Sequence, residues 1–214
     1  MIIKNAIKNQ SYKINFNIDL KKYLNNLIKK YYKVAIITDE NVYKIYKEKI
    51  NIKGLEILRV KPGEKSKSFN VKNSLDEKLL EKKFNRNSLI IGFGGGVVGD
   101  LSGYVAATIL RGIDLVHIPT SLIAIVDSSI GGKTGINSKN GKNLIGSFYN
   151  PREILINSEF IKTLSLKEIR QGLSEIIKYG VIKNEKIFNF LEKSNKVFMQ
   201  NHKKNICLLY TSPS

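Results

Sequence analysis

The chain alternates short, β-branched apolar runs with segments in which apolar residues recur at helical spacing. Such runs predict buried strands, and they lie at residues 12–16, 34–38, 55–60, 88–93, 115–119 and 153–157. Helical spacing falls between them, at residues 19–32, 41–49, 69–83 and 97–110. This alternation predicts the α/β class, with a Rossmann-like parallel sheet and right-handed crossovers. Ligands of such sheets bind at the carboxyl ends of the strands.

The pattern changes after Asn157, where only helices are expected. Ser165 and Glu168 form a capping-box signature that begins a helix running to residue 182. We therefore expect an α/β domain over residues 1–157 and the beginning of an all-helical domain over 158–214. The end of the chain, 208–214, fits no periodic element, and so short a helical layer has little to pack against. We expect a truncated fragment with a non-native terminus.

Composition places the chain among ordinary globular proteins, with 42% hydrophobic residues. A single cysteine, Cys207, excludes an internal disulfide framework and suits a reducing compartment. The N-terminus has no signal-peptide pattern and no apolar run is long enough to span a membrane. We therefore expect a cytoplasmic protein without a membrane partner.

The net charge of +18 raises the hypothesis of a nucleic-acid-binding protein. Only five of the 36 basic residues are arginine, however, and most of the excess charge lies outside residues 88–182. Readers of bases and phosphates favour the arginine fork. We interpret the charge as a solvated lysine coat and expect no nucleic-acid partner.

Three predicted strands are followed by polar or glycine-rich loops. Residues 92–100, "GFGGGVVGD", contain the spacing of the dinucleotide fingerprint, in which glycines let the backbone approach a pyrophosphate. The acidic residue expected about 20 positions later is missing, and Asp39 after an earlier strand is the better candidate for a ribose contact. Asp39 fits a helix N-cap equally well. With Glu64 and Lys67 after a third strand, the three loops favour a dinucleotide.

The stretch "DSSIGGKTGIN", residues 127–137, carries the Gly-Lys-Thr of a P-loop. A P-loop requires glycine where Asp127 stands, and a carboxylate there would repel phosphate. Lys133 therefore serves another anion, and Asp127 either pairs with a nearby cation or is an ordinary ion-paired loop residue. Further along, Glu175 and Lys178 share a helix face with Glu168, where a surface ion pair is the simplest interpretation.

Several long motifs resemble one family, that of 3-dehydroquinate synthase within the wider sugar phosphate cyclase group. These motifs are "GGGVVGDLSGYVAATILRGIDLVHIPTSLIAIVDSSIGGKTGIN", "GKNLIGSFYNP", "IKTL" and "GLSEIIKYG", and the similarity is continuous over residues 94–180. Glycerol and iron-dependent alcohol dehydrogenases share the fold but lack the Lys-Thr-Gly run, so a NAD- and metal-dependent polyol dehydrogenase is the alternative.

The resemblance implies which residues bind NAD, the substrate and zinc or cobalt. Arg111, Asp127, Lys133 and Lys178 would line the substrate side, and Glu175 would be a metal ligand. The implied coenzyme contacts are Asp39, Asn41, Gly63, Glu64, Lys67, Gly95, Gly96, Val97, Val98, Gly99, Asp100, Thr120, Ser121, Asp127, Ser128, Lys133, Lys142, Asn143, Phe160, Ile161, Lys162, Thr163, Leu164 and Glu168. Ser121 stands where the family usually has threonine, and its hydroxyl can still donate.

The resemblance also implies the reaction, in which 3-deoxy-D-arabino-heptulosonate 7-phosphate becomes 3-dehydroquinate and phosphate in the shikimate pathway. NAD⁺ would oxidise the C5 carbinol, phosphate would leave by β-elimination, the ketone would be reduced again, and an aldol closure would form the ring. A homodimer of the full-length enzyme is implied as well. Zinc needs at least three protein ligands, and the family's later histidines have no counterpart here, since His202 lies in no matching motif and His117 lies in a strand. We therefore expect the 214-residue chain to be inactive and to bind zinc poorly.

Overall fold

A seven-stranded sheet forms the centre of the computed structural model, which describes residues 2–5 and 10–200. Its order is β1-β2-β9-β6-β5-β3-β4, and only β1 runs antiparallel to its neighbour. The strands are β1 (Ile2–Asn5), β2 (Gln10–Phe16), β3 (Val34–Asp39), β4 (Leu55–Val60), β5 (Leu89–Gly94), β6 (Asp114–Pro119) and β9 (Glu153–Ile156). All six predicted strands are confirmed, and the α/β class with a Rossmann-like parallel sheet is correct.

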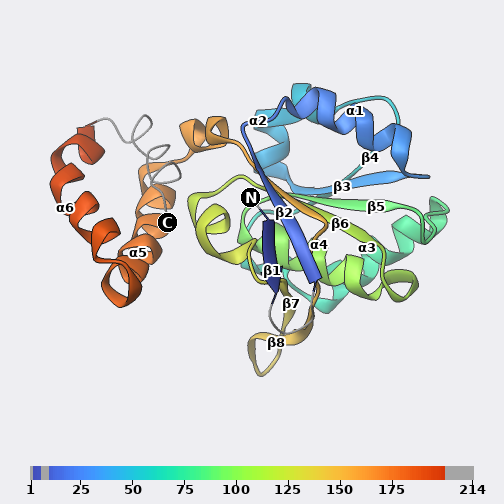
Figure 1. Cartoon of the computed structure of the whole chain (residues 1–214). Coiled ribbons are helices and arrows are strands. Elements are labelled where there is room, and N and C mark those ends of the chain that lie inside the picture. The colour runs from blue at the N-terminus through green and yellow to red at the C-terminus, as the bar shows by residue number, and fades with distance from the viewer. Residues whose placement is uncertain (1, 6–9, 201–214) are drawn as a thin grey trace.

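Helices cover both faces of this sheet (Figure 1). One face carries α1 (Leu20–Lys30) and α2 (Glu40–Ile50), and the other carries α3 (Phe69–Glu81) and α4 (Gly96–Thr108). Successive side chains of a strand point to opposite faces, so in β3 the residues Val34 and Ile36 join the core under α1 and α2, whereas Ala35 and Ile37 join the core under α3 and α4. Burial on both faces explains why these strands are continuous apolar runs in the sequence.

The strand order places a ligand crevice at one edge of the sheet. The chain leaves β3 for β4 on one side, returns to β5 on the other side of β3, and then continues outward to β6. In open α/β sheets, ligands bind where the strand order reverses, outside the carboxyl ends. Here that point lies beyond Asp39, Gly94 and Pro119, at the ends of β3, β5 and β6.

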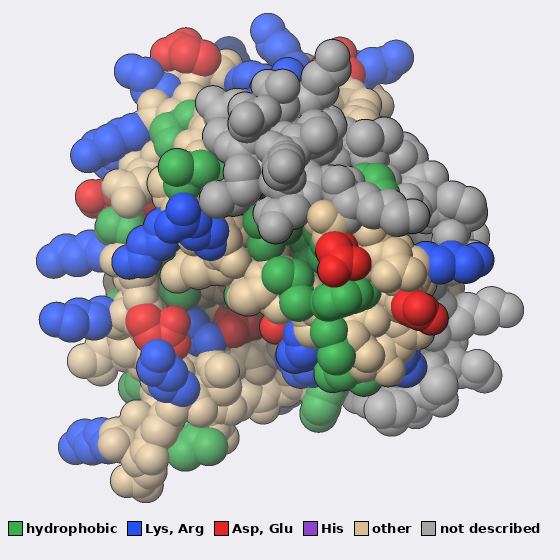
Figure 2. Space-filling model, turned by 90° about the vertical axis from the view of Figure 1, so that its left-hand side faces the viewer, with side chains coloured by type: hydrophobic (Ala, Val, Ile, Leu, Met, Phe, Trp, Pro, Cys, Tyr) green, Lys and Arg blue, Asp and Glu red, His purple; other side chains and the backbone are tan. Residues whose placement is uncertain are grey.

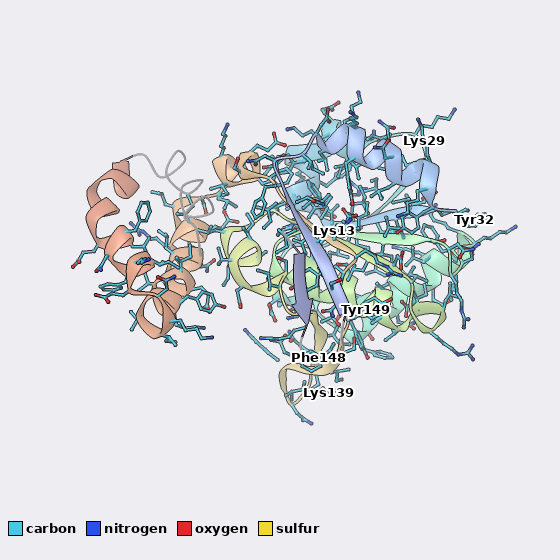
Figure 3. All side chains as sticks on the ribbon, in the orientation of Figure 1. Lys13, Lys29, Tyr32, Lys139, Phe148 and Tyr149 are labelled. Carbon is cyan, nitrogen blue, oxygen red and sulfur yellow. The ribbon has the colours of Figure 1, made fainter. Side chains whose placement is uncertain are left out.

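A two-stranded hairpin that the sequence did not predict follows β6. It consists of β7 (Lys133–Ser138) and β8 (Gly141–Phe148), which pair antiparallel and project from the body of the protein (Figure 1). Lys139 lies at its tip and Phe148 at its base (Figure 3). Its glycines interrupt the apolar alternation by which a strand is recognised in a sequence. At position 146 the structure requires glycine, because a Cβ there would lie 2.0 Å from the carbonyl oxygen of Thr134.

Two helices end the described part of the chain, α5 (Leu166–Lys183) and α6 (Glu185–Gln200), and they extend to one side of the sheet (Figure 1). Ser165 and Glu168 form the predicted capping box at the start of α5. Through Ile169 and Ile176, α5 packs on Leu122 and Ile125 of the segment after β6. The division into two domains at residue 157 stays a prediction.

Lysine and arginine side chains project singly around the outline of the face seen in Figure 2, with aspartate and glutamate among them. This distribution fits the interpretation of a lysine coat. Within residues 2–5 and 10–200, no helix has the length and apolar character needed to cross a bilayer.

His117 is a core residue of β6, as expected for a histidine in a strand. Its side chain is 4% exposed and its Nδ1 atom has no hydrogen-bond partner. A Cβ on Gly92 of the neighbouring strand would lie 3.0 Å from that Nδ1 and 2.2 Å from Oγ of Ser102, so glycine leaves room for both side chains. Burial away from solvent lowers the pKa of His117 to about 4.

We expect His117 to make the protein less stable in mild acid. The unfolded chain binds a proton near pH 6.5, whereas the folded chain does so only near pH 4. Stability is therefore complete above pH 6.5 and falls as the pH decreases toward 4, by at most about 3 kcal/mol. Denaturant unfolding between pH 4 and 8 measures this slope. His117→Leu should flatten it, and an unchanged slope in that variant would contradict the assignment.

Candidate functional site

A cleft of about 710 Å³ lies outside the carboxyl ends of β3, β5 and β6. It is bounded by the loops that the sequence singled out after these strands and by the first turn of α5. Twelve of the proposed coenzyme contacts line it, namely Asp39, Asn41, Gly63, Gly95, Gly96, Val97, Val98, Thr120, Ser121, Thr163, Leu164 and Glu168. Residues from five separate segments of the chain thus meet at the predicted crevice.

Asp39 is both the N-cap of α2 and a wall of this cleft. Its Oδ1 accepts from the backbone N–H groups of Asn41, at 2.9 Å, and Val42, at 3.0 Å. Both capping bonds use the same oxygen, so the capping role leaves Oδ2 for a ligand in the cleft. The two interpretations of Asp39 from the sequence are therefore compatible.

The glycine turn after β5 fits an anion. Gly95 is the N-cap of α4 and contributes no side-chain cap, so the first N–H groups of this helix are available to a ligand. Gly95 has φ −76° and ψ −172°, a conformation open to any residue, and a Cβ there would meet only the Ser121 side chain, with Oγ at 3.3 Å and Cβ at 3.7 Å. The fold does not require glycine at this position. A helix N-terminus facing open space suits the pyrophosphate of a dinucleotide.

Glu64 and Lys67, two other proposed coenzyme contacts, lie beside the cleft in a polar network. Lys67 is 4% exposed, and its ammonium group binds the carboxylate of Asp100 and the side-chain oxygen of Asn143. Burial raises the pKa of Asp100, and its bond to Lys67 opposes that shift. The Glu64 carboxylate lies 3.9 Å from the same ammonium group. Lys67 thus joins the loop after β4 to α4 and to the hairpin.

A second cleft of about 480 Å³ opens between α4, the hairpin and a π-helical turn, Ala124–Ser128. Proposed site residues line it: Asp100, Asp127, Ser128, Lys133 and Asn143. π-Helical turns are rare and occur frequently at functional sites, and this one carries Asp127. Lys133 is exposed at the start of β7, where its ammonium group can attract an anion.

Helix α5 approaches this second cleft with three polar side chains. Glu175 and Lys178 form the ion pair expected from their spacing, and the bond to Glu175 raises the pKa of Lys178. The hydroxyl of Tyr179 donates to Asp127 Oδ1 at 2.9 Å. Partial burial and the Asp127 carboxylate raise the pKa of Tyr179 to about 12, so it remains a donor at neutral pH. The sequence prediction did not include Tyr179, although its spacing from Glu175 puts both on one helix face.

Several of the proposed site residues do not line either cleft. Arg111 lies just before the amino end of β6, at the opposite edge of the sheet. Phe160 and Ile161 are buried in the core, at 0% and 1% exposure. Lys142 and Lys162 are exposed on the surface, and Gly99 lies inside α4.

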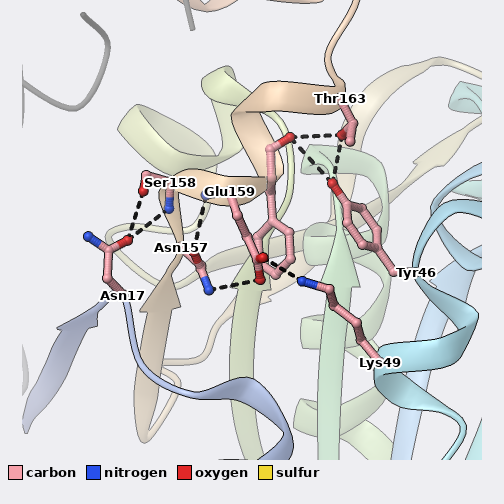
Figure 4. A network of polar contacts seen from close by, with 8 residues as sticks. Asn17, Tyr46, Lys49, Asn157, Ser158, Glu159 and Thr163 are labelled. Carbon is pink, nitrogen blue, oxygen red and sulfur yellow. Dashed lines mark hydrogen bonds and ion pairs between the residues drawn. The ribbon is translucent and has the colours of Figure 1, made fainter. Parts of the chain in front are cut away.

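The segment around Phe160 holds the cleft wall in place instead. The Tyr46 hydroxyl lies 2.6 Å from Thr163 Oγ1, which donates to the carbonyl oxygen of Phe160 at 2.9 Å (Figure 4). Lys49 and Glu159 form an ion pair between α2 and the same segment. These contacts fix Thr163 and Leu164, which do line the first cleft.

The described residues do not by themselves fit a complete zinc site. Glu175 is a possible ligand, but no group of three or more potential ligands gathers among residues 2–5 and 10–200. His117 is enclosed in the core, and His202 lies outside the described residues.

Known proteins resemble this chain in sequence and in fold. A 3-dehydroquinate synthase of Dictyoglomus thermophilum is 48% identical over 88% of this chain and 53% of its own length. The structure of 2-epi-5-epi-valiolone synthase (ValA) from Streptomyces hygroscopicus, with NAD⁺ and Zn²⁺ bound, matches with a TM-score of 0.80, at 26% identity over 92% of this chain and 56% of that one.

A more distant match bears on the alternative. Glycerol dehydrogenase from Schizosaccharomyces pombe matches with a TM-score of 0.60 at 21% identity, over 79% of this chain and 43% of that one, which shows a shared fold alone. The polyol dehydrogenase hypothesis is therefore not favoured. The chain spans about half the length of the curated relatives it matches.

A family model described as "3-dehydroquinate synthase N-terminal" matches residues 57–171. This range runs from within β4 to the start of α5 and includes the glycine turn, the hairpin, the lining of the second cleft and the part of the first cleft that follows β4. The chain therefore belongs to the 3-dehydroquinate synthase family.

Proposed function

We propose that this chain supplies the coenzyme site and part of the substrate site of a 3-dehydroquinate synthase. In the whole protein the reaction would convert 3-deoxy-D-arabino-heptulosonate 7-phosphate to 3-dehydroquinate and phosphate. One observation supports this most: the first two turns of α4 separate two clefts, with Gly96, Val97 and Val98 on the first and Asp100 on the second. A dinucleotide in the first cleft would therefore lie beside an anionic substrate in the second.

The first cleft has the groups that NAD needs. Gly95 and Gly96 leave the N–H groups of α4 open to the pyrophosphate, and Asp39 Oδ2 can accept from a ribose hydroxyl. Bound NAD supplies a hydride acceptor and, later, a hydride donor. The protein contributes binding and orientation, since the wall formed by Thr163 and Leu164 is fixed to α2 by the Tyr46 network.

The second cleft has the charges that a sugar acid phosphate needs. Lys133 would attract the phosphate or carboxylate, and it would stabilise the negative charge that grows on a departing phosphate. Asp127, held by Tyr179, can accept a hydrogen bond from a substrate hydroxyl. Lys178, paired with Glu175, adds a second cation at the α5 side.

Glu175 is our proposed metal ligand, in keeping with the Zn²⁺ and Co²⁺ bound in the cyclase structures that this fold resembles. A metal would polarise substrate oxygens, with its other ligands coming from outside the described residues. The homodimer that the resemblance implies, and the cytoplasmic location expected from the composition and the N-terminal sequence, also stay predictions.

Phosphate release tests the proposed activity. A full-length protein supplied with the heptulosonate phosphate, NAD⁺ and zinc should release phosphate without accumulating NADH, because the coenzyme is reoxidised in each turnover. A polyol dehydrogenase would instead accumulate NADH with glycerol. Lys133→Met should lower kcat/KM about 100-fold through the loss of charge stabilisation, whereas Lys139→Met, at the tip of the same hairpin (Figure 3), should leave it within about twofold. No phosphate release from the wild type would refute the proposal.

A further inference from the structure

Asn137 makes three hydrogen bonds, two of which join the hairpin to the loop after β4 while the third lies within the hairpin. Its backbone N–H donates to the carbonyl oxygen of Lys67 at 2.8 Å. Its side-chain Nδ2 donates to Glu64 Oε1 at 2.8 Å, and its Oδ1 accepts from the backbone N–H of Asn143 at 2.9 Å. One side chain thus links a segment that borders the coenzyme cleft to a residue that lines the second cleft.

The position of Asn137 in the hairpin explains why its side chain is free to do this. The pairing of β7 with β8 shifts register between Ile136 and Ser138, so Asn137 lies at a bulge and has no direct partner on β8. Bulges redirect side chains and often lie next to active sites. The asparagine amide offers a donor and an acceptor on two separate atoms, so one short side chain can bind Glu64 and the Asn143 N–H at the same time.

Asn143 depends on these contacts for its backbone conformation. Its φ is 58°, a left-handed conformation that is sterically unfavourable for residues other than glycine. The bond from its N–H to Asn137 and the bond from Lys67 to its side-chain oxygen hold it there. Strained residues fixed by their surroundings cluster at ligand sites, and Asn143 lies on the wall of the second cleft.

We propose that Asn137 is a positioning residue, which sets the hairpin and Asn143 in the geometry that the anionic substrate requires. This inference rests on the proposed function of the second cleft. Asn137 touches neither cleft itself and acts through Asn143 and Glu64. Its loss should therefore loosen the hairpin and weaken substrate binding while leaving the coenzyme cleft, which is built mainly from other segments, intact.

Asn137→Asp isolates the link to Glu64, because aspartate keeps the oxygen that accepts from Asn143 and replaces the donor with a second carboxylate. We expect the amides of β8 to exchange with deuterium about tenfold faster in this variant of the 214-residue chain, the equivalent of one lost hydrogen bond to a charged group. Asn137→Asp combined with Glu64→Gln restores a donor–acceptor pair in the opposite direction, and exchange should return to within about twofold of the wild type. Asn140→Asp, the same change at an exposed position of this hairpin, is the matched control and should have no effect.

Kinetics of the full-length enzyme separate positioning from general stability. Asn137→Asp should raise KM for the heptulosonate phosphate about tenfold and leave the Kd for NAD⁺, measured by calorimetry, within about twofold. Unchanged β8 exchange, failure of the double variant to restore it, or equal losses for substrate and coenzyme would each overturn the proposal. If the wild type lacks synthase activity, the proposed function fails, yet the exchange data still decide whether Asn137 holds the hairpin.

Discussion

Lys67→Met is expected to destabilise the protein by about 3–5 kcal/mol, because it leaves the Asp100 carboxylate buried without its cation. Lys67 is 4% exposed and Asp100 is 19% exposed at the side chain. Methionine has a similar length and reaches the same space without a charge. For a chain of this size the loss corresponds to a melting temperature lower by roughly 10 °C, which thermal unfolding followed by circular dichroism would measure.

The loss of stability in Lys67→Met should depend on pH, because the buried Asp100 carboxylate can be protonated. Burial already raises the pKa of Asp100, and Lys67 opposes that shift, so removal of the ammonium group raises the pKa further. Protonation then relieves the uncompensated charge, and the deficit of Lys67→Met should be larger at pH 8 than at pH 5. Lys65→Met, two positions away and exposed, is the matched control and should change stability by less than about 0.5 kcal/mol. Equal stability of both variants would show that the Lys67 ion pair contributes nothing net.

Gly95→Val is expected to weaken NAD⁺ binding by at least about 100-fold, or about 2.7 kcal/mol, without unfolding the protein. The backbone of Gly95 lies in a region open to every residue, and a Cβ there would lie 3.3 Å from Oγ of Ser121, which also lines the first cleft. Valine would place two methyl groups where a pyrophosphate must approach the N–H groups of α4. Isothermal calorimetry with NAD⁺ on the 214-residue chain measures the effect.

Two measurements make the result specific to the cleft. Ala107→Val adds the same two methyl groups near the far end of α4 and should leave the Kd for NAD⁺ within about twofold. The melting temperature of Gly95→Val should stay close to that of the wild type. If Gly95→Val binds NAD⁺ as tightly as the wild type, the coenzyme does not lie against this turn, and the assignment of the first cleft is wrong.

Local patterns predicted most of the fold but left out β1 and the hairpin. The strands β3, β5 and β6 are long apolar runs because they are buried on both faces, whereas β2 alternates buried and exposed residues. The capping box begins α5 at Ser165 as expected. The strands β7 and β8 were missed because Gly135, Gly141 and Gly146 interrupt any apolar alternation. Their strand character comes from pairing with each other and, for β7, from Ile136 in the core beneath α4.

The sequence predicts the position of a candidate site residue when that residue belongs to a short local motif. It does not predict which side chains from distant segments of the chain contact one another. The glycine turn at Gly95 and Gly96 follows from a short stretch after one strand, and it does line the first cleft. Arg111 follows from the same resemblance, yet α4 carries the chain back to the opposite edge of the sheet before that residue is reached. Lys67 stays a predicted coenzyme contact, and its ion pair with Asp100, 33 positions away, was not predicted.

The sequence alone therefore predicts six strands of the sheet, the helices between them and the loops at one sheet edge, because these depend on the burial and backbone preferences of neighbouring residues. Only the tertiary structure decided which polar groups meet there. Asn137 reaches Glu64 across 73 positions of the chain, and Tyr179 reaches Asp127 across 52. Contacts over such separations depend on strand order and on how the hairpin and α5 pack, and neither leaves a periodic trace in the sequence.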